Sequence, residues 1–141
     1  MSAAMDELDR EIVSILRQDA RTPYTEIAEE VDISEGTVRN RVDRLCEEGV
    51  IERFTVATRT GNVKAMIEVE VDVNVDTAAV SESIAKWDEV DFVWQVSGEE
   101  DIVVVVDMAD TESVNDLITR ARGMDDVMNT KTRLILDERL G

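Results

Sequence analysis

Residues 25–53 read Thr25-Glu-Ile-Ala-Glu-Glu-Val-Asp-Ile-Ser-Glu-Gly-Thr-Val-Arg-Asn-Arg-Val-Asp-Arg-Leu-Cys-Glu-Glu-Gly-Val-Ile-Glu-Arg53 and predict a helix, a tight turn, a second helix and a β element. Ser34 can cap the second helix, because its hydroxyl can accept a backbone N–H of the first turn. Gly49 is expected to end that helix as its C′ residue. A β stretch over residues 50–58 would make the unit a winged helix.

The second helix of this motif has an apolar side and a polar side. Val38, Val42 and Leu45 repeat at i, i+4 and i+7, which makes one apolar stripe. At about 100° per residue, four hydrogen-bonding or cationic side chains fall roughly opposite the stripe: Thr37, Asn40, Arg41 and Arg44. A short helix packed on one side and polar on the other is typical of a recognition helix in the major groove of DNA.

Two further helices complete a unit that we place over residues 1–60. Apolar residues follow helical spacing after Asp6, a predicted N-cap: Leu8, Ile12, Ile15 and Leu16. Pro23 suits the first turn of the next helix, whose inner face consists of Ile27, Ala28 and Val31. A plain three-helix bundle with a solvated outer face is the alternative. The cap, the outward Arg and Asn residues and the β exit after Gly49 together favour DNA binding.

The formal net charge of −18 over 141 residues conflicts with simple expectations for a DNA-binding protein. The basic residues nevertheless cluster between Arg39 and Arg53, on and after the second motif helix. The alternative interpretation is an acidic protein that does not bind nucleic acid, and it predicts no such cluster of basic residues. We predict a DNA interface with Ser34 at its edge, base-edge contacts from Thr37, Asn40, Arg41 and Arg44, and phosphate contacts from Arg39, Arg53 and Arg59.

The balance of charges also bears on the source of the protein. Only three lysines accompany twelve arginines in this acidic chain. Such a surface suits a cytoplasm near molar salt, where the Debye length is about 3 Å and self-repulsion costs little. We therefore infer a halophilic, archaeal source.

Several classes of protein are excluded by composition. No run of 18 apolar residues exists to span a membrane, and the N-terminus lacks the basic and apolar segments of a secretory signal, so a cytoplasmic location is expected. With one cysteine and no histidine, neither a Cys/His zinc site nor a nucleophile paired with histidine can form. We expect Cys46 to be a small buried apolar residue. No catalytic residue, metal or cofactor is predicted, and an enzyme is the least favoured class.

After a turn or linker at residues 59–63, the pattern changes in a second unit that we place over residues 61–141. Five apolar residues alternate with acidic or polar ones, which predicts a strand with one buried face: Ile67, Val69, Val71, Val73 and Val75. Further elements are expected as a helix over 77–87, a strand over 91–97, a helix over 111–122 capped by Gly123, and a last strand over 127–136. Residues 102–106 are continuously apolar, so this strand is expected at the centre of its sheet.

The fold class is therefore α+β, a winged helix-turn-helix followed by a ferredoxin-like β-α-β-β-α-β domain. Helices cover one face of such a sheet, and the other face needs a partner. We expect that face to include apolar residues of the second and last strands: Phe92, Trp94, Val96, Met128, Thr130, Thr132, Leu134 and Leu136. Because no segment remains to cover it, two sheets are expected to pack face to face in a homodimer.

This arrangement resembles the Lrp/AsnC family of feast-or-famine transcription regulators over nearly the whole chain. Three stretches carry the resemblance: Leu8–Arg21, Ile33–Leu45 with Glu48–Ile51, and Val96–Ile102. They look like the family's first helix, its recognition helix with wing, and its Gly-x-x-Asp effector turn. The resemblance implies a homodimer that often assembles further, commonly into octamers, on pseudo-palindromic promoter DNA. It also implies, for many members, control by an amino acid bound between dimers.

Matched onto this chain, the effector site would comprise Ser97, Gly98 and Asp101 of the turn with Thr130 and Thr132 of the last strand. Carboxylates can hold an α-ammonium group, and threonine hydroxyls can bond a polar side chain. The position before Asp101 is often aromatic in the family and is Glu100 here. Glu99, Glu100 and Asp101 favour a cationic or amine-bearing ligand or a hydrated metal cation, but they equally fit an acidic halophile turn.

Two functions of different classes follow from the sequence. The first is a sequence-specific regulator that binds double-stranded promoter DNA and responds to an amino acid or similar effector. The second is a stand-alone sensor or assembly module whose helix-turn-helix mediates protein contacts. The arginines of the second motif helix favour the first.

Overall fold

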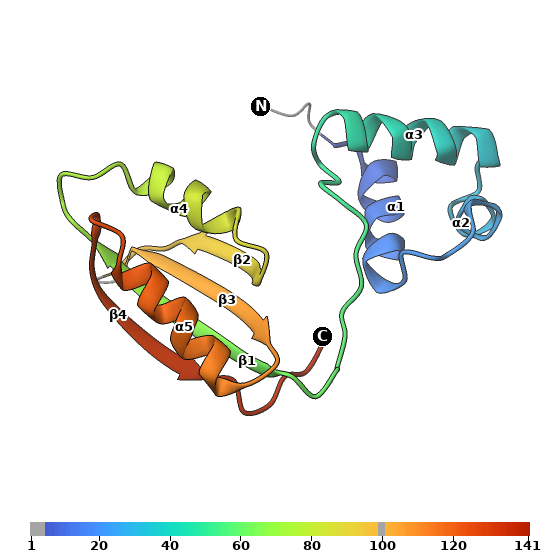
Figure 1. Cartoon of the computed structure of the whole chain (residues 1–141). Helices are drawn as coiled ribbons and strands as arrows, with labels where there is room; N and C mark the ends of the chain where they lie inside the picture. Colours follow the sequence, from blue (N-terminus) through green and yellow to red (C-terminus); the bar gives the residue numbers. More distant parts are fainter. Residues whose placement is uncertain (1–4, 99–100) are drawn as a thin grey trace. The chain divides into compact units, whose positions relative to one another are not determined.

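The computed structural model describes residues 5–98 and 101–141 and divides the chain into two compact units, Met1–Thr58 and Arg59–Gly141. The first unit contains three helices, α1 (Glu7–Gln18), α2 (Tyr24–Val31) and α3 (Glu35–Glu47) (Figure 1). Their inner faces meet in a small core made by Ile12, Leu16, Ile27, Ala28, Val38 and Val42. The predicted apolar stripes are therefore the buried ones.

Polar residues fix where the helices of the first unit begin and end. Asp6 caps α1 in a capping box, in which its side chain accepts the backbone N–H of Asp9 at 2.8 Å. Ser34 caps α3 as predicted, accepting the N–H of Thr37 at 3.1 Å. Asp32 adopts the left-handed conformation (φ 56°) between α2 and α3, which makes the tight turn of the motif.

The end of α3 follows the prediction, but the β element after it does not. Gly49 has φ +77°, as expected for a C′ residue, and the N–H of Ile51 bonds to the carbonyl of Leu45. Residues 50–60 do not form a strand, so the predicted β stretch over 50–58 is wrong. A strand needs a hydrogen-bonding partner as well as a suitable sequence, and none of the described strands pairs with this segment.

The second unit is a four-stranded antiparallel sheet with two helices. Its elements are β1 (Val63–Val71), α4 (Thr77–Ala85), β2 (Val90–Gln95), β3 (Ile102–Met108), α5 (Thr111–Arg122) and β4 (Val127–Leu134). The strand order is β2-β3-β1-β4, which is the predicted ferredoxin-like arrangement with β3 inside the sheet. Helices α4 and α5 cover one face (Figure 1) and bury Val80, Ile84, Val114 and Leu117 against it.

The opposite face of the sheet, which we call the open face, is half apolar. The strand register places Trp94, Val103, Glu68 and Lys131 in one row across the sheet, because residues directly opposite each other point to the same side. The next row contains Phe92, Val105, Met66 and Arg133. Phe92 and Trp94 are about half exposed, and their rings stack with 5.6 Å between the ring centroids.

The prediction that Thr130, Thr132 and Leu134 of β4 lie on the open face is wrong. Thr130, Thr132 and Leu134 lie opposite Val69, Ile67 and Ala65, whose side chains are buried on the helix side. A register shift between Glu70 and Val71 breaks the strict alternation of β4. The sequence pattern alone does not show such a bulge.

Three smaller predictions also differ from the structure. The first strand ends at Val71, so Val73 lies outside it and is almost fully exposed. Leu136 lies beyond β4 and is likewise exposed. Cys46 is exposed, because it lies beside the stripe of α3 and not within it.

In the part of the chain that the structure describes, no helix has the length and apolar character to cross a membrane.

Candidate nucleic-acid interface and effector turn

The first two turns of α3 present the polar groups best suited to a groove. Val38, Val42 and Leu45 fix the inner side, so Asn40 is turned outward and is exposed. The hydroxyls of Ser34 and Thr37 lie 2.8 Å apart and share a hydrogen bond. A recognition helix typically reads base edges with its N-terminal residues, which matches this position of Thr37 and Asn40.

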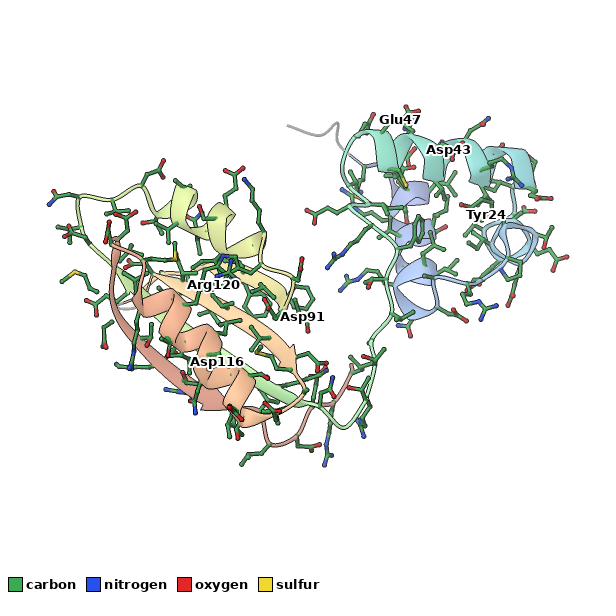
Figure 2. The ribbon with its side chains drawn as sticks, in the orientation of Figure 1. Tyr24, Asp43, Glu47, Asp91, Asp116 and Arg120 are labelled. Carbon is green, nitrogen blue, oxygen red and sulfur yellow. The ribbon has the colours of Figure 1, made fainter. Side chains whose placement is uncertain are left out.

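The outward side becomes acidic farther along α3. Asp43 follows Asn40 by three residues and Glu47 follows Asp43 by four, so the three positions share one side of the helix. Figure 2 labels Asp43 and Glu47 on α3. Both carboxylates are exposed. They would repel phosphates, which favours the N-terminal half of α3 as the part that could face DNA.

Arg39 projects from the side of α3 and is engaged locally. Its Nη2 lies 2.9 Å from Oε1 of Glu35, one turn earlier. Its guanidinium also lies 5.4 Å from the centre of the Tyr24 ring on α2, within the range of a cation–π contact. Glu35 is exposed and Tyr24 is half-buried. Because water screens contacts at the surface, these two contacts stabilise the position of Arg39 only weakly.

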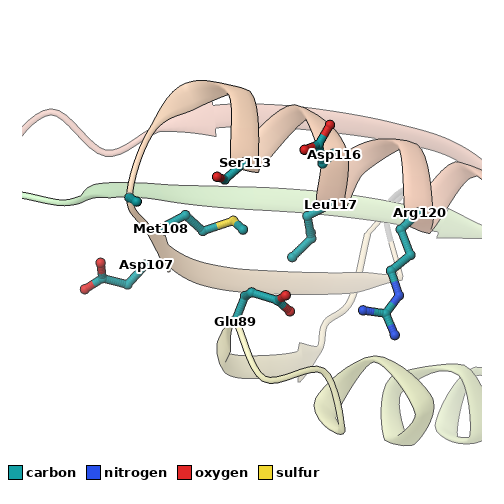
Figure 3. A pocket seen from close by; sticks show the side chains of 8 residues that line it. Glu89, Asp107, Met108, Ser113, Asp116, Leu117 and Arg120 are labelled. Atoms are coloured by element: carbon teal, nitrogen blue, oxygen red, sulfur yellow. The ribbon is translucent and has the colours of Figure 1, made fainter.

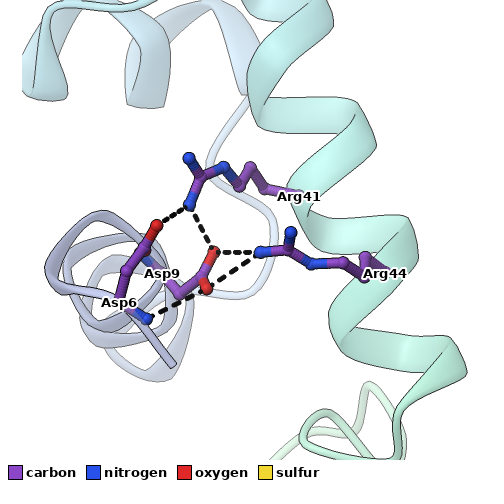
Figure 4. Close-up of polar contacts among 4 residues, drawn as sticks. All are labelled: Asp6, Asp9, Arg41 and Arg44. Carbon is purple, nitrogen blue, oxygen red and sulfur yellow. Dashed lines mark hydrogen bonds and ion pairs between the residues drawn. The ribbon is translucent and has the colours of Figure 1, made fainter. Parts of the chain in front are cut away.

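Arg41 and Arg44 do not extend freely outward as predicted, because they turn toward α1 (Figure 4). Arg41 pairs with Asp6, and its Nη1 lies 3.1 Å from Oδ1 of Asp9. Arg44 Nη2 lies 3.0 Å from Oδ2 of Asp9. The helical wheel places both arginines opposite the apolar stripe only approximately, and two carboxylates of α1 attract them to one flank.

The electrostatic effect of this cluster is mutual. The backbone N–H of Asp9 and then the guanidinium of Arg41 lower the pKa of Asp6 below its ordinary value. Hydrogen bonds to Asp6 and then to Asp9 raise the pKa of Arg41. Both groups are therefore held in their charged forms.

Asp9 is the functional candidate that sequence reasoning missed. It is a carboxylate with only 2% of its surface exposed. Its position gave a signal, since Asp9, Ile12 and Leu16 follow i, i+3, i+7 on the inner stripe of α1. A charged residue on an apolar stripe requires a buried partner.

The remaining predicted phosphate contacts lie outside α3. Arg53 is an exposed residue of the extended segment that follows it. Arg59, in the second unit, donates from Nη2 to the carbonyl of Glu138 at 2.9 Å. Arg59 therefore helps to hold the C-terminal residues beside β1.

The predicted effector turn is tied to β1 by Asp101. Its N–H donates to the carbonyl of Val69, and its Oδ2 accepts the N–H of Val71, both at 3.1 Å. Gly98 has φ +127°, a conformation that favours glycine, and Ser97 is exposed beside it. Glu99 and Glu100 lie outside the described residues. One oxygen of the Asp101 carboxylate thus has a structural role already.

The structure separates the two predicted threonines from this turn. Thr130 is buried on the helix side, where its Oγ1 accepts a hydrogen bond from Nε of Arg122 at 2.9 Å. Thr132 lies on the same side and is exposed. Strand β1 stands between β3 and β4, so Thr130 lies two strand spacings, about 10 Å, from the β3 edge of the turn.

Two hollows lie elsewhere in the second unit. One of about 440 Å³ is lined by Met108 and Leu117 with the charged side chains of Glu89, Asp116 and Arg120 (Figure 3). Arg120 lies 4.1 Å from the centre of the Trp87 ring. Another of about 330 Å³ lies at the start of α4. Neither is lined by a predicted effector residue, and the described residues contain no cluster of three potential metal ligands.

Comparison with known proteins agrees with this fold in both units. A family model described as winged helix-turn-helix DNA-binding matches residues 5–52, and one described as Lrp/AsnC ligand binding domain matches residues 64–140. The HTH-type transcriptional regulator LysM of Sulfurisphaera tokodaii is 38% identical, over 95% of this chain and 96% of its own.

Solved structures of other proteins share this fold. The crystal structure of MtbAldR superposes with a TM-score of 0.87 at 28% identity, covering 97% of this chain and 95% of its own. The Mycobacterium tuberculosis leucine response regulatory protein LrpA gives 0.80 at 28% identity, covering 97% and 96%. The fold and these relatives define a DNA-binding regulator of transcription, which favours this function over the assembly module. The chain belongs to the Lrp/AsnC family.

Proposed function

We propose that this regulator contacts promoter DNA with the N-terminal half of α3, and that residues 1–60 are its DNA-binding domain. The capped helix start, which presents Thr37 and Asn40 outward, carries this proposal. The proposed interface comprises Ser34, Thr37, Arg39, Asn40, Arg41, Arg44, Arg53 and Arg59. Arg41 and Arg44 can join it only by giving up contacts with Asp6 and Asp9.

The test begins with selection of a binding site from random duplexes at molar KCl. Asn40→Ala should then weaken binding to the selected site by about 1–3 kcal/mol, the worth of one base-reading contact. Arg139→Ala, which removes an exposed charge of the second unit, serves as the control. Equal effects of the two variants would rule out the proposed base contact.

We further propose that residues 61–141 mediate homodimerisation through the open face and bind an effector. The stacked Phe92 and Trp94 support the dimer, because half-exposed aromatic rings on a sheet face are suited to burial by a second copy. We propose that such dimers can assemble further, up to an octamer. Since the protein regulates transcription, we place it in the cytoplasm with the chromosome.

For the effector we propose an amino acid at the turn formed by Ser97, Gly98, Glu99, Glu100 and Asp101, with Thr130 and Thr132 as further candidates. The second oxygen of Asp101 and the open backbone at Gly98 support this position. Because β1 separates the threonines from the turn, the turn is the stronger part of the proposal. Calorimetry with each of the twenty amino acids in high salt tests it, and neither heat nor a thermal shift with any of them would refute it.

A further inference from the structure

The ion-pair cluster between α1 and α3 is centred on one buried carboxylate. Asp9 Oδ1 lies 3.1 Å from Arg41 Nη1 and 3.3 Å from Arg44 Nη2, while its Oδ2 lies 3.0 Å from Arg44 Nη2 (Figure 4). Asp9 Oδ2 also accepts the backbone N–H of Asp6. Asp9 therefore links the start of α1 to two successive turns of the recognition helix.

Burial makes these contacts hard to replace. Asp9 is 2% exposed, so its charge has lost its water and depends on the two guanidinium groups. Asp6 remains exposed and adds a second carboxylate to Arg41. Two negative and two positive charges thus balance within the cluster.

The cluster reduces the positive charge that α3 offers to DNA. Arg41 and Arg44 have side chains 25% and 49% exposed, so both can be reached from solvent. Arg39, the third arginine of α3, is paired with Glu35. Each arginine of the recognition helix must therefore exchange a carboxylate for a phosphate if it is to add to backbone binding.

We propose that Asp9 is a specificity-determining residue of the DNA interface, because it withholds Arg41 and Arg44 from sequence-independent phosphate binding. This inference rests on the proposed function, in which α3 faces DNA. Discrimination between sequences then depends on Thr37 and Asn40, which make no ion pair. Arg41 and Arg44 act as links between α3 and α1 until a phosphate competes for them.

The experiment measures binding of the full-length chain to a fluorescent duplex of mixed sequence over a series of KCl concentrations. Asp9→Asn should free Arg44 and leave Arg41 held by Asp6 alone, and it should steepen the slope of log affinity against log salt by about 1–2. The gain in non-specific affinity over the wild type should grow by up to about tenfold as salt falls from about 200 to about 50 mM, since six to ten phosphate contacts lose about 10³–10⁵ in affinity over the reverse change. Affinity for a selected site should rise less, so the specificity ratio falls.

Two variants control for folding and for charge. Asp6→Asn keeps a helix-capping side chain and removes one of the two carboxylates that hold Arg41, so it should steepen the slope by about 1 or less. It tests the inference even if Asp9→Asn fails to fold, which circular dichroism would reveal. Glu11→Gln removes one negative charge from an exposed position of α1 without releasing an arginine, and it should leave the slope unchanged.

The outcomes separate the inference from the proposed interface. Unchanged or weaker non-specific binding by Asp6→Asn and Asp9→Asn, with wild-type binding intact, would overturn the inference alone. A slope that steepens equally in Glu11→Gln would also overturn it, because net charge would then be the cause. A wild-type chain that binds no duplex would overturn the proposed interface and the inference together.

Discussion

At the scale of the residue, short polar side chains fix where the helices of this protein begin. Asp6, Ser34, Asp76 and Asp110 each accept a backbone N–H in the first turn of a helix. At Asp110 the N–H of Ser113 donates to Oδ1 at 2.7 Å, and this contact lowers the pKa of the carboxyl group. An aspartate cap whose pKa is lowered in this way makes helix stability depend on pH.

We predict that the protein loses part of its stability in acid through Asp110. Because its pKa is lower in the folded state, the stabilisation is complete above the pKa of the unfolded chain and is lost as pH falls through the folded value. Asp110→Asn keeps a capping side chain that does not titrate. Urea unfolding at a series of acidic pH values should therefore show a shallower loss of stability for this variant, and parallel curves would count against the prediction.

At the scale of the element, two glycines of the recognition-helix region have opposite conformational demands. Gly49 has φ +77° at the end of α3, whereas Gly36 lies within the first turn of the same helix. An added Cβ at Gly49 would meet nothing within 4 Å, and at Gly36 only Ser34 Oγ at 4.0 Å. Their substitution thus tests backbone conformation and not space.

We predict that Gly49→Ala lowers the free energy of unfolding by about 1–2 kcal/mol, the cost of a left-handed alanine. Gly36→Ala should leave it unchanged or raise it by up to about 1 kcal/mol, because alanine favours helix. Thermal and urea unfolding of the two variants under the same salt conditions checks the pair. The same sign of change in both would contradict this account.

The elements show what a single sequence can and cannot predict. The bounds of α5 and its end at Gly123 were predicted because caps and apolar spacing are local signals. The β stretch after Gly49 and the face of β4 were predicted wrongly, because both depend on pairing partners far along the chain. The same distinction holds for the candidate DNA interface. The positions of Ser34 and Asn40 could be predicted from the sequence of α3 alone. The orientation of Arg41 and Arg44 toward Asp9 could not, because it depends on how α1 packs against α3.

At the scale of the whole molecule, charge and the open face govern behaviour. With a net charge of −18 the folded chain repels itself wherever salt is low. The open face has stacked aromatic rings on β2 and charged side chains, Glu68 and Lys131, on β1 and β4. A haloarchaeal source and a dimer are both predictions at this scale.

We predict that the melting temperature rises continuously as KCl is increased toward molar concentration, because screening removes the repulsion among carboxylates. Thermal unfolding followed by circular dichroism measures this. NaCl should act similarly if screening is the cause. A melting temperature independent of salt would contradict the halophilic interpretation.

We also predict that Trp94→Glu converts the proposed homodimer into a monomer, since it would bury a charge where two stacked aromatic pairs meet. Light scattering coupled to size-exclusion chromatography measures the mass. Val73→Glu, at a fully accessible loop position, makes the same chemical change and should leave the mass unaltered. A dimer in both variants would place the contact elsewhere.

The irregular outer strands have a consequence for how copies of this chain can meet. β2 and β4 form the two edges of the sheet, and each has a shift of register against its inner neighbour. Irregular, twisted edges are poor templates for adding another strand. Growth of the sheet from chain to chain, which leads to open-ended fibres, is thereby discouraged. At high protein concentration, copies of this chain would then form closed oligomers and would not precipitate as fibres.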